Sequence, residues 1–157
     1  MTFRKEHKIR VTLSEYHKFQ NLLYKQGLTT LFNSRVIHSV YFDTVDLKMF
    51  RDSEEGVRPR KKVRIRWYDN GKIFFQESKI SSIEGRFKTS NKLGFALSEA
   101  QIAEKILFDP MYGPVYPALK ISYKRSYFSL KNLRVTFDEN ISYQKIDKNY
   151  QRIYYDP

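Results

Sequence analysis

The sequence contains no cysteine among its 157 residues, which excludes disulfide scaffolds, zinc fingers and thiolate catalysis. Glycine and proline are also scarce, with six and five residues, and no linker-like or low-complexity stretch interrupts the chain. No apolar run approaches the length of about 18 residues that a membrane-spanning helix needs. The first residues lack the apolar segment of a signal peptide. We therefore expect one domain over residues 1–157 in a reducing compartment, the cytoplasm.

Positive charge is what the sequence has in excess. Lysine and arginine number 29 against 17 acidic residues, which gives a net charge of +12. An excess of this size predicts an anionic partner, such as a phosphate compound, a nucleic acid or a membrane surface. Aromatic residues make up 16% of the chain, and this richness favours strands over a long helical bundle.

Two or three short helices are predicted beside the strands. Residues 12–15 fit a capping box, and the apolar stripe after them predicts a helix over 12–26 that packs on the sheet. A second short helix is expected through 47–50. A third, capped at Ser98, is expected over 98–107. Alternation at period two predicts the strands 4–11, 36–43, 61–68, 72–80, 117–128 and 133–143.

The clearest element is a β-hairpin around Asn70-Gly71, the strongest two-residue hairpin signal. If these two residues form the loop, Arg64 faces Glu77, Lys62 faces Lys79 and Arg66 faces Phe75. One face of the hairpin then carries these charged side chains. The other face is predicted to be core and carries Val63, Ile65, Trp67 and Phe74.

Charges of mostly one sign recur on one face of at least four expected strands. Exposure to solvent is the ordinary explanation for any one strand. Because helices are few, however, a large sheet is expected to close into a barrel, and a charged interior then needs a ligand of opposite charge. Lysines and arginines at alternate positions would hold successive phosphates.

The carboxylates on these faces suggest a metal. Glu6, Glu77 and Asp138 would suit Mg²⁺ or Mn²⁺, which prefer oxygen ligands and bridge carboxylates to phosphates. Two alternatives remain at this point. In the first, Glu77 does not bind a metal but neutralises Arg64 across the hairpin. In the second, Asp138 does not bind a metal but caps a turn.

Six segments in this order resemble the VTC domain, the polyphosphate-polymerase branch of the triphosphate tunnel metalloenzymes within the CYTH-like superfamily. The likeness covers residues 3–143. Its segments are Arg4-x-Glu6-x-Lys8, Ser39-Val40-Tyr41-Phe42-Asp43-Thr44, Lys62-Val63-Arg64-Ile65-Arg66-Trp67-Tyr68, Glu77-Ser78-Lys79, residues 117–125 and Arg134-Val135-Thr136-Phe137-Asp138.

The resemblance implies a mainly β (α+β) fold, an antiparallel β-barrel tunnel with short helices outside. It implies binding of ATP and inorganic polyphosphate, and transfer of the γ-phosphate of ATP to a polyphosphate chain with Mg²⁺ or Mn²⁺. Lys79 and Arg64 would position the transferred group. The phosphate-binding residues implied by position are Lys8, Lys62, Arg64, Arg66, Lys79, Arg125 and Arg134.

One departure from the family concerns its last strand, a Glu-x-Lys segment that supplies a metal-binding glutamate. That strand is not found here, so we expect an incomplete barrel, weak or absent polymerase activity and self-association through open edges. The alternative functions are a metal-dependent triphosphatase and a non-catalytic polyphosphate or nucleic-acid-binding module. Nucleic acid is the less favoured ligand, because the hairpin aromatics mostly fall on the face opposite the cations.

Overall fold

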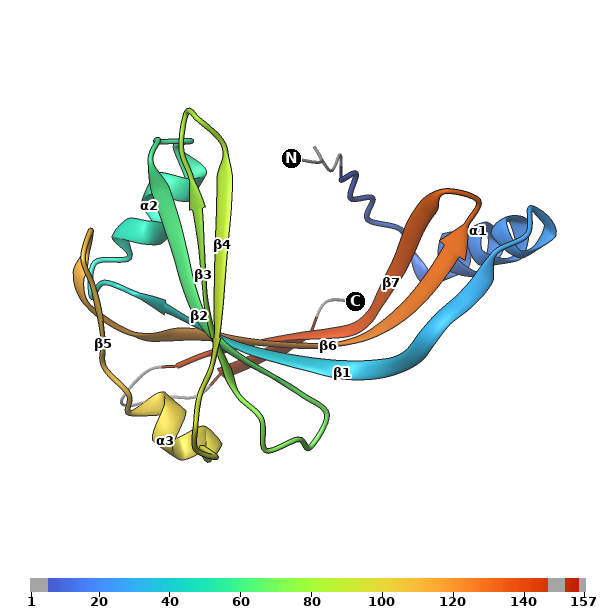
Figure 1. Cartoon of the computed structure of the whole chain (residues 1–157). Helices are drawn as coiled ribbons and strands as arrows, with labels where there is room; N and C mark the ends of the chain where they lie inside the picture. Colours follow the sequence, from blue (N-terminus) through green and yellow to red (C-terminus); the bar gives the residue numbers. More distant parts are fainter. Residues whose placement is uncertain (1–5, 147–151, 156–157) are drawn as a thin grey trace. The chain divides into compact units, whose positions relative to one another are not determined.

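A computed structural model describes residues 6–146 and 152–155, which form three short helices and eight strands. The strand order in the sheet is β4-β3-β2-β1-β6-β7-β8, and β5 pairs with β6. Figure 1 shows the long strands β1, β6 and β7 running side by side. The elements are α1 (Leu13–Lys25), β1 (Thr29–Asp43), α2 (Lys48–Glu54), β2 (Arg60–Tyr68), β3 (Phe75–Ser81), β4 (Arg86–Lys92), α3 (Glu99–Ala103), β5 (Leu107–Asp109), β6 (Gly113–Leu130), β7 (Leu133–Lys145) and β8 (Arg152–Tyr155).

The sheet is open. Its order ends at β4 on one side and at β8 on the other, and these two strands do not pair within the described residues. The predicted mainly antiparallel β fold with short helices is therefore confirmed in the form of an incomplete barrel. None of the helices in the described ranges is long and apolar enough to cross a membrane.

The chain divides into two compact units. The first comprises residues up to 33 together with 126–137, and the second comprises 34–125 together with the residues from 138 on. The core of the first unit is small and consists of Leu28, Phe128 and Phe137. The core of the second unit is larger and lies between the sheet and the helices α2 and α3. It is built from Val40, Phe42, Met49, Val63, Ile65, Trp67, Phe74, Ile102 and Val115.

Helix α1 begins with the predicted capping box, in which Thr12 accepts from the backbone N–H of Glu15 and Glu15 accepts from Thr12. Its apolar stripe is used only in part. Tyr16 and Leu23 pack on the core of the first unit, whereas Phe19 and Leu22 remain 40% and 54% exposed. The prediction that the whole stripe packs on the sheet is therefore wrong.

The predicted strand over residues 4–11 is also wrong where it can be checked. Residues 6–12 form neither helix nor strand and are exposed, and residues 4–5 lie outside the described part of the chain. Alternating charges of both signs imitate the period of a strand. Ile9 and Val11 are the only apolar residues of this segment, too few to bury a continuous face, and burial of such a face is what fixes a strand in a sheet.

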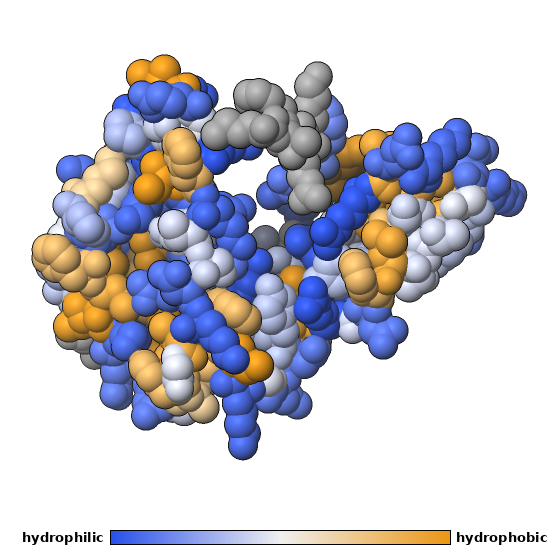
Figure 2. All heavy atoms as spheres, viewed as in Figure 1, coloured by the Kyte–Doolittle hydropathy of each residue, from blue (hydrophilic) through white to orange (hydrophobic). Residues whose placement is uncertain are grey.

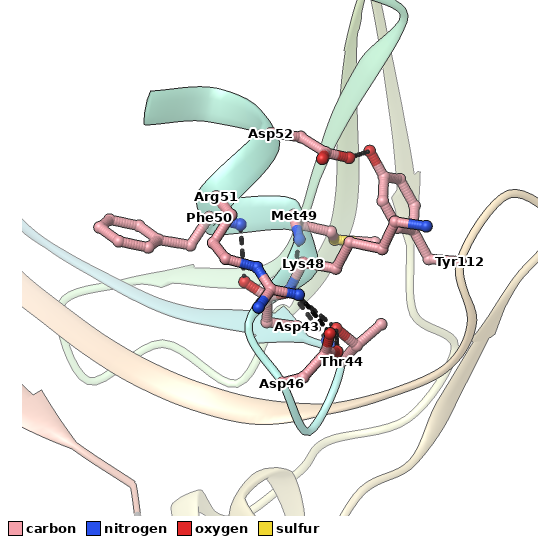
Figure 3. Close-up of polar contacts among 9 residues, drawn as sticks. All are labelled: Asp43, Thr44, Asp46, Lys48, Met49, Phe50, Arg51, Asp52 and Tyr112. Atoms are coloured by element: carbon pink, nitrogen blue, oxygen red, sulfur yellow. Dashed lines mark hydrogen bonds and ion pairs between the residues drawn. The ribbon is translucent and has the colours of Figure 1, made fainter. Parts of the chain in front are cut away.

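Helix α2 begins after a left-handed Leu47, and the carboxylate of Asp43 caps it (Figure 3). Oδ1 of Asp43 accepts from the backbone N–H of Met49 at 2.8 Å, and Oδ2 accepts from that of Phe50 at 2.9 Å. The Thr44 hydroxyl accepts from the N–H of Lys48. A negative charge at a helix N-terminus is favourable, so this pair at the end of β1 fixes α2 on the core.

The hairpin register agrees with the prediction. Arg64 pairs with Glu77, Lys62 with Lys79 and Arg66 with Phe75. Val63, Ile65, Trp67 and Phe74 are buried as expected. The connection is longer than the predicted two residues, because regular pairing stops at Phe75 and residues 69–74 form the loop.

Two smaller differences concern the second half of the chain. Helix α3 has the predicted capping box at Ser98 but ends at Ala103, so Ile106 lies beyond it and is 61% exposed. Residues 152–155, for which the sequence predicted no element, form β8 and pair with β7.

Candidate phosphate-binding face

The face of β2, β3 and β4 opposite the core carries eight cations and a single carboxylate. We call it the cationic face. It follows from the register of the three strands, because alternate residues of each strand lie on the same side. All of it belongs to the second unit. Its charged residues are Arg60, Lys62, Arg64, Arg66, Glu77, Lys79, Arg86, Lys88 and Lys92.

Glu77 is the buried anion of this face and forms ion pairs with three cations. Its Oε2 accepts from Nε and Nη2 of Arg64 at 2.8 and 2.6 Å. Nζ of Lys88 lies 2.7 Å from Oε1, and Nη1 of Arg66 lies 3.9 Å from Oε2. The Glu77 side chain is only 5% exposed. The carboxylate therefore holds three cations of the cationic face together.

The electrostatic balance at Glu77 favours its charged form. Burial raises the pKa of a carboxyl group, but the hydrogen bonds from Lys88 and Arg64 and the charges of both arginines outweigh burial. Together they lower the pKa of Glu77 from 4.5 to about 2. Glu77 is thus ionised throughout the neutral range and offsets part of the positive charge.

The two arginines of β2 are held by neighbours on β1. Nη1 of Arg64 donates to the Tyr41 hydroxyl at 2.8 Å, and the Arg64 guanidinium lies 5.7 Å from the centre of the Tyr41 ring. Nε of Arg66 donates to Oγ of Ser39 at 3.1 Å. Both arginine side chains are mostly buried, with 11% and 12% exposure. Their guanidinium groups are pre-positioned, which lowers the entropic cost of binding an anion.

A row of three lysines crosses the same face. Lys62 on β2 pairs with Lys79 on β3, and Lys79 pairs with Lys88 on β4. We call these residues the lysine row. Like charges directly opposite one another destabilise a sheet. The ion pair between Lys88 and Glu77 offsets part of this repulsion within the lysine row.

Arg125 and Asp138 form an ion pair elsewhere in the same unit. Nε and Nη2 of Arg125 donate to the two oxygens of Asp138, each at 2.6 Å, in a bidentate arrangement. The guanidinium also lies 5.1 Å from the ring centre of Tyr123. Burial raises the pKa of Tyr123, and the charges of Arg125 and Arg66 act against that rise.

The other predicted site residues belong to the first unit. Nζ of Lys8 lies 3.9 Å from Oε1 of Glu6, and both side chains are largely exposed. The guanidinium of Arg134 lies 5.3 Å from the ring centre of Tyr127. Glu6, Lys8 and Arg134 belong to a different unit from the cationic face. Their role in one site with that face therefore stays a prediction.

The carboxylates do not fit a metal ion as they are arranged. Both oxygens of Glu77 and both of Asp138 accept hydrogen bonds from cations. Within residues 6–146 and 152–155, no three imidazole or carboxylate groups are close enough together to hold a metal. Of the two interpretations of Glu77, neutralisation of Arg64 is the one that the geometry supports. The metal site at Glu6, Glu77 and Asp138 stays an unsupported prediction.

Sequence reasoning missed part of the cationic face. The third strand adds Arg86, Lys88 and Lys92, and Arg60 extends β2 by one row. The alternation of Arg86 and Lys88 was visible, but nothing in the sequence fixed how β4 pairs with β3. Ser39 and Tyr41, which hold the two arginines, lie in one of the segments that resemble the VTC domain, but the sequence alone predicts no contact for them. Their position across from Arg66 and Arg64 depends on the β1–β2 register.

The fold and the cationic face together define a mainly antiparallel β-sheet protein with rows of cations on one face of its sheet. In a comparison with protein families, the model of the VTC domain matches residues 3–156 of this chain. The chain therefore belongs to the VTC domain family. Comparison with curated proteins finds no match.

Proposed function

We propose that the cationic face binds the phosphate groups of ATP and of inorganic polyphosphate. The observation that carries the proposal is the charge pattern, eight cations in rows across three strands with one buried counter-ion. Hydrophilic side chains predominate in the space-filling view of the molecule, with smaller hydrophobic areas among them (Figure 2). A chain of phosphates carries a charge at short, regular intervals, and rows of fixed cations match such a ligand.

Within this proposal, the residues have different tasks. Arg66 and Arg64 offer planar guanidinium groups held by Ser39 and Tyr41, and such groups bind phosphate in a bidentate way. Lys62 and Lys79 act as point charges in the lysine row. Arg125 would also bind a phosphate, once the phosphate replaces Asp138 as the partner of its guanidinium group.

Membership of the VTC domain family supports the reaction that we propose, transfer of the γ-phosphate of ATP to a polyphosphate chain. Phosphoryl transfer needs little covalent chemistry from a protein. Catalysis comes from holding the reacting groups in line and neutralising charge on the transferred phosphate. The pre-positioned Arg64 and the nearby Lys79 would supply both effects. A divalent ion, supplied with the nucleotide, would provide further charge neutralisation.

The binding test compares Arg66→Gln with Arg51→Gln. Arg51 is the matched control, because it lies on α2 and pairs with Asp46 away from the cationic face. Losing a charge-assisted hydrogen bond costs about 1.5–3 kcal/mol. Calorimetry should therefore show roughly 10- to 100-fold weaker binding of tripolyphosphate for Arg66→Gln and unchanged binding for Arg51→Gln. Equal, salt-sensitive binding of an oligonucleotide of matched charge would indicate a generic basic surface.

The activity test is incubation of the protein with ATP and either Mn²⁺ or Mg²⁺, with polyphosphate and free phosphate measured separately. Formation of polymer that Arg64→Gln and Lys79→Gln abolish would support phosphoryl transfer to polyphosphate. Release of phosphate without polymer would replace that reaction by triphosphate hydrolysis. Binding without either product would reduce the proposal to a polyphosphate-binding module.

A further inference from the structure

One end of the cationic face is aromatic. Alternation along the hairpin places Trp67 and Phe74 in the core, and their neighbours Tyr68 and Phe75 on the opposite side, with the cations. The two rings meet edge to face, with centroids 6.2 Å apart and an interplanar angle of 69°. Both side chains are half-buried. The cationic face therefore has a local apolar surface at the end where β2 leaves the sheet.

A third residue completes this surface. The guanidinium of Arg35 lies over the ring of Tyr68, 4.5 Å from its centre. Ile37, which pairs with Tyr68 across β1 and β2, is 1% exposed and gives the ring an apolar neighbour. We call Arg35, Tyr68 and Phe75 the aromatic end. Aromatic rings and arginine planes are the groups on which nucleobases stack in proteins.

The aromatic end is continuous with the phosphate-binding residues. Phe75 pairs with Arg66 on one side and with Lys92 on the other. From Phe75 the strand runs to Glu77 and then to Lys79 of the lysine row, about 14 Å at roughly 3.4 Å per residue. A ligand with a flat aromatic group at one end and a string of phosphates at the other matches this order of side chains.

We propose that the aromatic end binds the base of a nucleoside triphosphate, with the phosphates directed along β3 toward the lysine row. This inference rests on the proposed phosphate-binding function and adds to it a direction and a preference. The base stays at the Phe75 end, and the terminal phosphate reaches toward Lys79. The protein then prefers a nucleoside triphosphate to an inorganic triphosphate.

The experiment measures the dissociation constants of ATP and of inorganic tripolyphosphate by calorimetry. The variants are Tyr68→Leu, Phe75→Leu and Tyr68→Phe. The matched control is Phe87→Leu, since Phe87 lies on β4, is 52% exposed and falls on the other side of the sheet. Tripolyphosphate binding also reports whether each variant is folded.

We expect Tyr68→Leu and Phe75→Leu to weaken ATP binding about tenfold, the size of a base–aromatic stack, and to leave tripolyphosphate unchanged. Tyr68→Phe keeps the ring and should bind ATP like the wild type, as should Phe87→Leu. Equal loss for both ligands would show that the rings only support the sheet and would overturn the inference. Unchanged ATP binding would overturn it too, while the phosphate-binding proposal stands. If the wild type binds neither ligand, both proposals fail.

Discussion

The two faces of the β2–β3 hairpin have the same backbone and opposite chemistry. On the core face, Ile65 and Val63 are 0% and 4% exposed, and they pack with α2 and α3 beneath the sheet. On the cationic face, the neighbouring Arg64 is held by hydrogen bonds to Glu77 and Tyr41. The residues of the core face stabilise the fold, and the residues of the other face are those that we propose to bind phosphate. The two functions can therefore be perturbed separately.

The largest effect is expected where the cationic face itself contributes to stability. Glu77→Ala leaves Arg64 buried without its counter-ion, which should lower the free energy of unfolding by roughly 3–5 kcal/mol. Urea denaturation measures the change. Added tripolyphosphate should restore more stability to this variant than to the wild type, since the ligand supplies the missing negative charge.

The matched variant Glu77→Gln keeps the shape and an acceptor oxygen, so it should lose less stability than Glu77→Ala. A loss below about 0.5 kcal/mol in Glu77→Ala, the size seen for ordinary surface substitutions, would contradict the role of Glu77 as the counter-ion.

The core face gives the next effect. Ile65→Ala removes a fully buried side chain and should cost about 2–5 kcal/mol of stability through lost burial and the cavity left behind. Below its unfolding transition, the variant should bind tripolyphosphate like the wild type. Ile83→Ala, at an 82% exposed position, is the control and should change neither property. A strong loss of binding in folded Ile65→Ala would show that the two faces are coupled.

Acid should weaken the cationic face through protonation of Glu77. The pKa of Glu77 is about 2 in the folded protein and close to 4.5 without its partners. The stability from this depressed pKa is fully present above about pH 4.5 and is lost as pH falls toward 2. Urea denaturation between pH 6 and pH 2 should show a smaller loss in Glu77→Gln than in the wild type. Identical pH profiles would contradict the assignment.

The hairpin was predictable because two signals agreed on it. Asn70-Gly71 marked the reversal, and an alternating apolar set ending at Trp67 marked the buried side, so the pairing of Arg64 with Glu77 followed even though the loop is longer. A shift of the strand register by one residue would bury the charged side chains. Because this shift is so unfavourable, the register can be predicted from the sequence. The capping boxes of α1 and α3 could also be predicted, because each involves residues only three positions apart in the sequence.

Longer-range features were not predictable in the same way. Residues 6–12 have the alternation of a strand but are not among the strands of the described sheet. The third row of cations on β4 and the contacts from Ser39 and Tyr41 depend on pairing between strands that are far apart in sequence or joined by an ambiguous turn. Composition could indicate an anionic ligand, but only the register shows which cations share a face.

The smallest effect on stability, and the sharpest separation of the two faces, is expected at Lys62. This side chain is exposed in the lysine row and faces Lys79. Lys62→Gln removes a like-charge contact, so the free energy of unfolding should stay the same or rise by a few tenths of a kcal/mol. Binding of tripolyphosphate should nevertheless weaken and depend less steeply on salt, because one fewer cation meets the phosphates.

Lys124→Gln is the matched control. Lys124 is an exposed strand lysine in the same unit, and it alternates with Arg125 to the other side of β6. If Lys62→Gln and Lys124→Gln weakened binding equally, only net charge would matter. The eight cations would then be a diffuse field rather than an ordered binding face.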